Sequence, residues 1–235
     1  MLPFAASYVK TCRRKEPDLA KCLLEQTVES VKPYLPTGIP KMKIPALEPF
    51  VIPNLEVTRK SEALDLKLNI KDLKAWGGSN FIVKNLKVNY EKLTAEGTLV
   101  LPLIHTTCEY DIDGRILVIP LKGKGLFKGN ITNIRADLSG SGELTTDKKG
   151  RSIAQIKTAI VKMKIGDAVG NAVNVDHNRN NEVITETAVN FYTNNRRQVL
   201  DIATPIAEEI ATEFIFQIGN QILGSVLLDE ILPDN

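Results

Sequence analysis

Residues 195–228 read NRRQVLDIATPIAEEIATEFIFQIGNQILGSVLL, and this stretch sets the expected fold. Its apolar residues recur at steps of three and four: Val199, Ile202, Ala203, Ile206, Ile210, Phe214, Ile218, Ile222 and Val226. Its polar residues fall on the opposite side: Asp201, Thr204, Glu208, Thr212 and Glu213. This spacing predicts one amphipathic helix roughly 50 Å long, in a protein whose radius of gyration should be about 17–18 Å. Such a helix spans the molecule, so it requires an elongated apolar surface to cover it.

Most of the chain before this helix has the alternating pattern of β-strands. Leu64, Leu66, Leu68 and Ile70 alternate with polar residues, and further alternation follows over 81–90, 93–101, 106–112, 134–138 and 151–165. The phase changes near Asn85, which predicts a β-bulge. Turns are expected at 76–79, at Asp113-Gly114 and at 123–125, and a polar loop over 173–181. One polar and one apolar face per strand indicates antiparallel pairing. The predicted class is therefore α+β: a curved antiparallel sheet wrapped around a long C-terminal helix.

The N-terminal part should cover this body. Residues 17–34 have helical spacing, with Pro17 in the first turn. Residues 33–53 hold prolines at 33, 36, 40, 45, 49 and 53 and are also apolar, so we expect an irregular strap that lies on the body. The whole chain, 1–235, is interpreted as one domain.

Composition narrows the class of protein. A net charge of +2 gives no electrostatic reason to bind nucleic acid, and no apolar run is long enough for stable membrane insertion. Leu2–Val9 is too short for the core of a signal peptide, so a secreted protein would already have lost its signal.

Cys12 and Cys22 are expected to form a disulfide, with two free thiols in a cytosolic protein as the alternative. Cys108 is expected to be free, and Asn130-Ile131-Thr132 is a glycosylation sequon.

Recognisable catalytic and metal-binding patterns are missing from the sequence. His105 and His177 lack spaced partner ligands, and no G-x-S-x-G is present. Gly123, Gly125 and Gly129 do not have the spacing of a nucleotide loop and are interpreted as glycines in a tight turn. We therefore expect no metal, no cofactor and no enzyme activity.

Three segments resemble the takeout and juvenile-hormone-binding family of insects. They are YDIDGRILVIPLKGKG over 110–125, PIAEEI over 205–210 and DEILPD over 229–234. The cysteine pair and the proline strap stand in the same order as in that family. The chain departs from the family pattern where Asn195-Arg196 replaces an Asn-Trp pair. It also has one cysteine pair where the hormone-binding branch has two, so it is more similar to the takeout branch.

The resemblance implies a secreted, extracellular carrier with an internal hydrophobic tunnel for a terpenoid, isoprenoid or fatty-acyl chain, and no enzyme activity. The alternative is a membrane- or partner-docking module without a transported ligand; no protein receptor is identified. The residues expected on the tunnel wall, or else in a solid core, are Leu64, Leu66, Leu86, Val88, Leu99, Leu101, Cys108, Tyr110, Ile116, Val118, Ile156, Val161, Met163, Ile206, Ile210 and Phe214.

Overall fold

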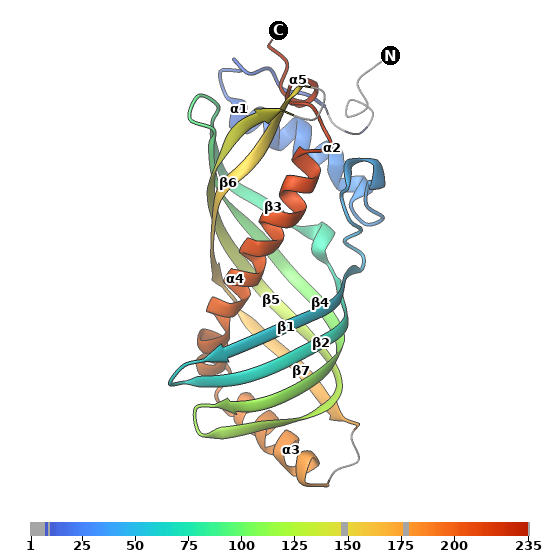
Figure 1. The fold of residues 1–235 in the computed structure, drawn as a ribbon, viewed down its shortest axis with the longest axis vertical. Helices are drawn as coiled ribbons and strands as arrows, with labels where there is room; N and C mark the ends of the chain where they lie inside the picture. The colour runs from blue at the N-terminus through green and yellow to red at the C-terminus, as the bar shows by residue number, and fades with distance from the viewer. Residues whose placement is uncertain (1–7, 9, 147–149, 176–178, 235) are drawn as a thin grey trace.

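The computed structural model describes residues 8, 10–146, 150–175 and 179–234 (Figure 1). Its sheet is antiparallel and strongly curled, with the order β1-β2-β4-β5-β6; β3 also pairs with β4, and β7 with β5. The strands are β1 (Phe50–Lys60), β2 (Leu64–Trp76), β3 (Ile82–Asn89), β4 (Thr94–Ile116), β5 (Ile119–Thr146), β6 (Ser152–Lys164) and β7 (Asp167–Asn174). A curled antiparallel sheet with a long C-terminal helix agrees with the predicted α+β class.

The β4–β5 hairpin forms the centre of the sheet, and the other strands extend from its two edges. β2 and then β3 pair along one edge of β4, separated by the short 3₁₀ segment η5 (Gly78–Asn80). β6 and then β7 pair along the free edge of β5. The prediction of a meander of short hairpins therefore underestimated β4 and β5, because it divided each long strand at its prolines and glycines. It also missed β7, whose last two residues overlap the loop predicted over 173–181, since asparagines obscure the alternation of that strand.

Two predicted turns lie inside strands. Gly114 is in β4, opposite Leu66 and Leu121, and the chain reverses at Leu117-Val118 instead. Gly114 has φ +152°, and a Cβ there would lie 2.1 Å from the carbonyl oxygen of Asp65, so only glycine permits this strand approach. Gly125 likewise lies inside β5, where a Cβ would meet the carbonyl oxygen of Val173 at 2.0 Å. The tight turn predicted at 123–125 is therefore wrong.

β-Bulges change which residues face the interior. The predicted bulge at Asn85 is confirmed: Asn85 has φ +52° and the β3–β4 register shifts between Lys84 and Lys87. Asp72 in β2 has φ +48° at a second register shift. Asn133 in β5 has φ +52° where the inward residues change from odd to even numbers. Asn and Asp tolerate this left-handed region, and bulges increase twist, so these residues help the sheet to curl.

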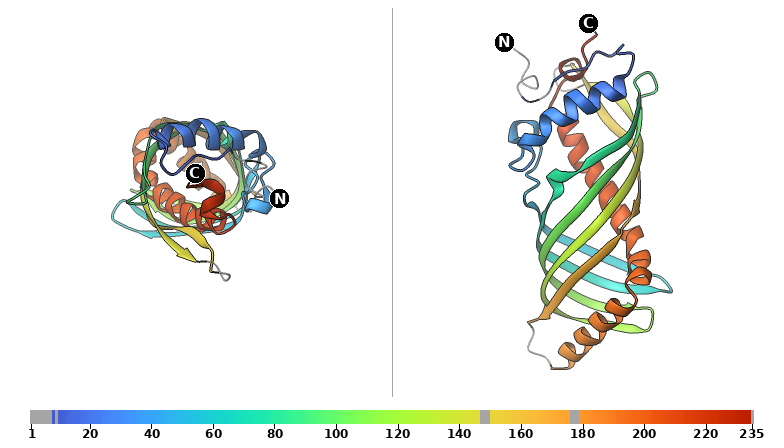
Figure 2. Two further views of the ribbon diagram at one scale, coloured as in Figure 1. Left: turned by 90° about the horizontal axis from the view of Figure 1, so that it is seen from above. Right: turned by 180° about the vertical axis from the view of Figure 1, so that it is seen from behind.

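The helical region after the sheet contains three helices: α3 (Arg179–Asn194), α4 (Arg196–Leu223) and α5 (Leu228–Ile231). α4 is about 42 Å long and continues through Pro205. The helix predicted over 195–228 therefore ends early, at Gly224, and α3 was missed as a separate element. Seen along the molecule, the strands and α4 together surround the interior (Figure 2).

α4 closes the open side of the curled sheet. It packs on β6, and it contacts β1 at the opposite end of the strand order through the Arg59–Glu209 ion pair. The rings of Phe50 in β1 and Phe214 in α4 lie 5.8 Å apart. The sheet therefore does not fully enclose the helix, because α4 itself forms part of the wall.

The solvent-facing side of α4 differs from the predicted one. Its exposed residues include Asp201, Ala203, Pro205, Glu209, Glu213, Gln217 and Gln221. Glu208, predicted to face solvent, has a side chain only 15% exposed and accepts a hydrogen bond from the Met163 backbone N–H at 2.8 Å. Thr204 and Thr212 are half-buried, with hydroxyls that donate to the Leu200 and Glu208 carbonyls. The assignment of all these polar residues to the solvent side was wrong because the side chains of Thr204, Glu208 and Thr212 form hydrogen bonds to the helix backbone or to β6.

N-terminal segments cover one end of the molecule. The predicted helix over 17–34 is present as α1 (Leu19–Cys22), a π-helical segment η2 (Leu23–Val28), α2 (Glu29–Val31) and a 3₁₀ turn η3 (Lys32–Tyr34). Cys12 and Cys22 form the predicted disulfide. The strap packs Ile39 and Met42, of η4 (Pro40–Met42), against Val226. Its last residues belong to β1, an edge strand that tolerates Pro53.

Candidate functional site

The first of two interior cavities lies at the α3 end of the molecule. This α3 cavity has a volume of about 440 Å³ and is enclosed by β2, β4, β5, β7 and α3. Apolar side chains dominate its wall, and they include Leu68, Ile70, Ile112, Ile116, Leu121, Phe127, Ile131, Ile184, Val189 and Phe191. A space of this size and lining is typical of sites for small apolar ligands.

Two glycines shape the floor of the α3 cavity. Gly129 in β5 pairs directly with Gly170 in β7. A Cβ at either position would approach Cζ of Phe127, to 2.7 Å and 2.6 Å respectively. Because neither glycine has a side chain, the ring of Phe127 lies directly against the backbone of β5 and β7. The space that the ring would fill if it were displaced from there remains part of the cavity.

Apart from Lys122, whose side chain is exposed, this wall carries titratable groups at Cys108 and Tyr192 that stay neutral. Burial raises the pKa of the Cys108 thiol, so the sulfur stays protonated. Burial, followed by the nearby Asp167, raises the pKa of Tyr192, although Arg196 opposes the shift. The Tyr192 hydroxyl donates a hydrogen bond of 2.5 Å to the Ala168 carbonyl. A neutral wall with few donors favours an apolar guest.

The second cavity lies at the α5 end. This α5 cavity has a volume of about 590 Å³ and lies between β3, β4, β5, β6, α4 and α5. Its apolar lining residues include Val28, Val83, Leu86, Val88, Leu93, Leu99, Leu138, Ile156, Ile215, Leu223, Leu228 and Leu232. Gly97 of β4 lies beside Leu86, where an added Cβ would make an ordinary van der Waals contact at 3.5 Å.

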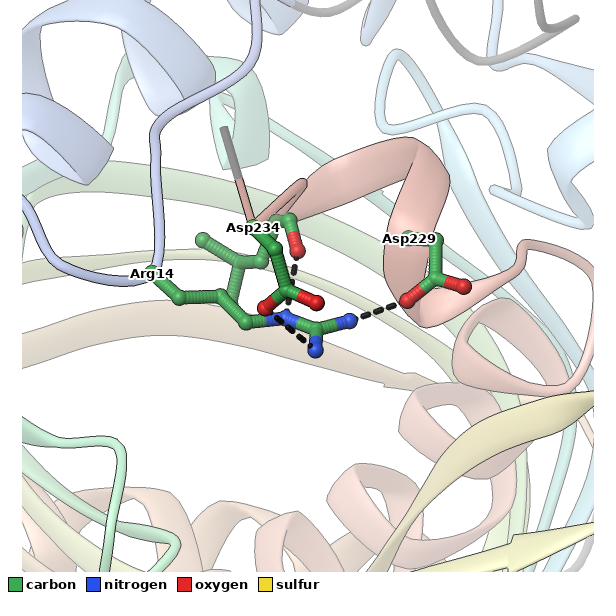
Figure 3. Close-up of polar contacts among 4 residues, drawn as sticks. Arg14, Asp229 and Asp234 are labelled. Atoms are coloured by element: carbon green, nitrogen blue, oxygen red, sulfur yellow. Dashed lines mark hydrogen bonds and ion pairs between the residues drawn. The ribbon is translucent and has the colours of Figure 1, made fainter.

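Arg14 fastens the N- and C-terminal segments together over the α5 cavity (Figure 3). Its guanidinium donates to the Leu232 carbonyl at 2.7 Å and pairs with Asp229 and Asp234. The same group lies 5.5 Å from the centre of the Tyr90 ring. Only 16% of the Arg14 side chain is exposed, and its bond to the Leu232 carbonyl is partly buried, whereas the Asp229 and Asp234 side chains are 74% and 71% exposed, so their ion pairs are screened by solvent.

Buried residues lie between the two cavities. In β4 the wall of the α5 cavity ends at Leu99 and that of the α3 cavity begins at Cys108, with Ile104 and Thr106 buried between them. In β5, Ala136 is buried between Ile131 on the α3 cavity wall and Leu138 on the α5 cavity wall, and it pairs with Leu99 of β4. The interior therefore has two cavities separated by a packed middle layer.

The predicted wall residues divide among four environments. Cys108, Tyr110 and Ile116 line the α3 cavity. Leu86, Val88, Leu99 and Ile156 line the α5 cavity. Leu64, Leu66 and Ile116 form a buried cluster against which Ile206 packs, and Val161 is also buried. Ile206, Ile210 and Phe214 line the groove between α4 and β1, while Leu101 and Met163 are half-buried outside both cavities.

Val118 was placed wrongly. It sits at the β4–β5 turn and is 88% exposed, because the turn comes later than Asp113-Gly114. The α3 residues on the cavity wall were missed altogether. Ile184, Ala188 and Phe191 do have the i, i+4, i+7 spacing of a helix face, which is the signal that would have identified them.

Within the described ranges, no group of three or more His, Cys, Asp or Glu side chains is arranged to hold a metal ion. The Nδ1–H of His105 donates a hydrogen bond at 2.8 Å to Oδ1 of the exposed Asn130 of the sequon. His177 lies outside the described residues. None of the helices in the described part has the length and apolar character needed to cross a bilayer.

Comparison of the sequence and comparison of the fold both identify known proteins that are similar to this chain. The circadian clock-controlled protein daywake of Drosophila melanogaster and that of Drosophila yakuba are each 31% identical over 126 residues, which cover 51% of this chain. Those residues are 47% of each relative, so the match spans about half of their length. The crystal structure of takeout 1 from Epiphyas postvittana is 22% identical, with a TM-score of 0.74 over 95% of this chain and 99% of that one, and has the same fold.

A family model covers almost the whole chain. The model of the haemolymph juvenile hormone binding proteins matches residues 3–233, which include both cavities and the segments that close them. This family consists of secreted carriers of hydrophobic ligands and is not a family of enzymes. The chain therefore belongs to the haemolymph juvenile hormone binding protein family.

Proposed function

We propose that this protein is an extracellular carrier that holds a hydrophobic small molecule in its interior. In this proposal residues 1–235 act as one ligand-binding domain. The observation that supports it is the pair of interior cavities, about 440 Å³ and 590 Å³, with predominantly apolar walls. An apolar chain gains about 0.8 kcal/mol for each CH₂ group removed from water, so preformed spaces of this kind provide affinity without charged groups.

The chemistry of the walls favours a terpenoid, isoprenoid or fatty-acyl ligand. The polar groups that line the α3 cavity include the neutral thiol of Cys108 and the hydroxyls of Tyr110, Thr185 and Tyr192, besides the exposed side chains of Lys122 and Asn130. These groups suit an ester, ether or hydroxyl on an otherwise apolar ligand. A single tunnel would require the buried layer around Ile104 and Ala136 to open.

The proposal is tested on protein secreted from insect cells. Organic extraction and mass spectrometry should recover a bound lipid or terpenoid, and the stripped protein should bind a fluorescent anthroyloxy fatty acid saturably. An empty extract together with no saturable binding would reject the carrier function. The same preparation shows whether Asn130 carries a glycan, which we propose because its side chain is exposed in a sequon.

Docking to a partner is a second candidate, and one observation favours it. Leu126 and Val173 pair directly on the β5–β7 surface and are 53% and 51% exposed. Val169, four pairs along the same ladder, is also exposed. Replacing Leu126 and Val173 by Ser should leave fatty-acid binding unchanged if the protein acts as a carrier; loss of a cellular activity with intact binding would support docking.

A further inference from the structure

We propose that ligand enters and leaves the α3 cavity at the α3 end of the molecule, with α3 as the lid. This inference rests on the proposed carrier function and specifies which end of the molecule opens. It follows from a comparison of how the two ends are closed.

The α5 end is fastened at several points. The Cys12–Cys22 disulfide ties the N-terminal arm to the first helix, and Arg14 of that arm holds Leu232, Asp229 and Asp234. The backbone N–H of Arg14 also donates to the Pro233 carbonyl at 3.1 Å. These contacts include a covalent bond, so opening this end would require several of them to break together.

The strap adds a further attachment at the same end. Met42 and Ile39 are 4% and 2% exposed and pack on Val226, just after α4. The Ser225 hydroxyl donates to the Met42 carbonyl at 3.1 Å. Movement of the C-terminal segment would therefore expose a packed apolar cluster to water.

α3 covers the other end in a different way. No residue of α3 is fully buried, although Ile184, Ala188, Val189 and Phe191 point to the interior side and line the cavity. Of these side chains, Phe191 packs against the buried cluster of Leu64, Leu66 and Ile116, whereas Ile184, Ala188 and Val189 border the cavity. Moving α3 away from the sheet therefore breaks fewer packing contacts than moving a fully buried helix would. A ligand in the cavity would contact the α3 side chains that border it.

A hinge exists where α3 meets α4. Asn195 separates the two helices with φ −128° and ψ 30°. The start of α4 is fixed to the β6–β7 junction, since Arg196 pairs with Asp167 at 2.8 Å and Arg197 donates to the Ile165 carbonyl at 2.7 Å. Tyr192, on the α3 side of the break, is held by its bond to Ala168. Rotation at Asn195 would thus move α3, require release of at least the Tyr192–Ala168 and Asn174–Thr185 bonds, and leave α4 in place.

The first experiment compares two latches by stopped-flow binding of an anthroyloxy fatty acid. Tyr192→Phe keeps the ring and removes the bond to Ala168, so association should become about threefold to tenfold faster; the equilibrium affinity is measured beside it, because the Tyr192 hydroxyl also lines the cavity. Arg14→Gln removes the matched latch at the α5 end and should lower the melting temperature while leaving the association rate unchanged. Faster binding by Arg14→Gln, or equal effects of the two changes, would overturn the proposal.

The second experiment locks the lid. Asn174 of β7 and Thr185 of α3 meet with Nδ2 and Oγ1 3.5 Å apart, so Asn174→Cys with Thr185→Cys, in a Cys108→Ala background, places a disulfide across the gap. Oxidation should slow association at least about tenfold, and dithiothreitol should reverse the effect. The Cys108→Ala parent controls for reduction of Cys12–Cys22. Unchanged association in the locked protein would overturn the α3 lid, whereas absence of probe binding in wild type would instead reject the carrier function.

Discussion

Glu48 shows how one partly buried carboxylate fixes the strap to the sheet. Burial alone would raise its pKa, but hydrogen bonds from the Gly77 N–H at 2.7 Å and from the Ser79 hydroxyl and N–H at 2.7 and 2.9 Å outweigh it and lower the pKa below the ordinary 4.5. The stabilisation is complete above that ordinary value and is lost as pH falls through the lowered folded-state pKa.

Replacing Glu48 by Gln should therefore have a pH-dependent effect. We expect a loss of about 1–3 kcal/mol of unfolding free energy at pH 7, because charged acceptors make the stronger hydrogen bonds. The difference from wild type should shrink below pH 4.5, where the wild-type carboxylate becomes protonated. Urea unfolding at several pH values measures it, with exposed Glu91→Gln as the control; a constant difference across pH would contradict the assignment.

Gly170 tests the floor of the α3 cavity. In Gly170→Ala the new methyl group would lie 2.6 Å from Phe127 Cζ and force that ring into the cavity. Overpacking of this kind costs about 1–3 kcal/mol, and the loss of volume should weaken fatty-acid binding. Phe127→Leu in the same chain should restore much of the stability. If the double variant were no more stable than Gly170→Ala, the conflict would lie elsewhere, for example with the Lys128 carbonyl at 3.1 Å.

At the scale of elements, α4 is held to β6 through Glu208. Its carboxylate accepts from the Met163 N–H on the unpaired edge of β6 and pairs with Lys162 at 3.0 Å, and these contacts lower its pKa. Glu208→Ala should lose about 1–3 kcal/mol of unfolding free energy because it leaves a buried edge N–H without its acceptor. The exposed Glu213→Ala on the same helix should cost less than about 0.5 kcal/mol. Equal losses in chemical denaturation would show that Glu208 does not fasten the helix.

The same elements show what sequence periodicity can and cannot predict. Strand alternation identified the antiparallel sheet, and the phase change at Asn85 identified a bulge, because both leave a local signal. Gly114 and Gly125 were misread as turns, since a glycine needed for the approach of a neighbouring strand looks the same in sequence as a glycine in a turn. Glu208 was assigned to solvent because its partner Met163 is distant in the chain. These wrong assignments at Gly114, Gly125 and Glu208 all involve contacts with residues that are distant in the chain, which local sequence patterns do not reveal.

At the scale of the whole molecule, the sequence predicted apolar residues for an interior but not their division into two cavities. Leu86, Val88 and Leu99 and the pair Cys108 and Tyr110 were expected on one continuous wall, yet they line opposite ends. The division depends on which side chains fill the middle, such as Ile104 and Ala136. Residues in a packed layer and on a cavity wall have the same apolar character, so only their three-dimensional arrangement distinguishes them.

The two cavities can be tested separately by filling each one. Ala188→Phe places a ring in the α3 cavity, and Ala159→Phe does so in the α5 cavity. Thr187 of α3 and Lys157 of β6 are exposed and line neither cavity, so Thr187→Phe and Lys157→Phe are the controls. A ligand at one hundred times its dissociation constant stabilises a carrier by about 2.7 kcal/mol, which raises the melting temperature. Each cavity-filling change should remove part of that rise and the two together all of it, whereas both controls should keep it. A full rise in the double variant would mean that fatty acid binds outside both cavities.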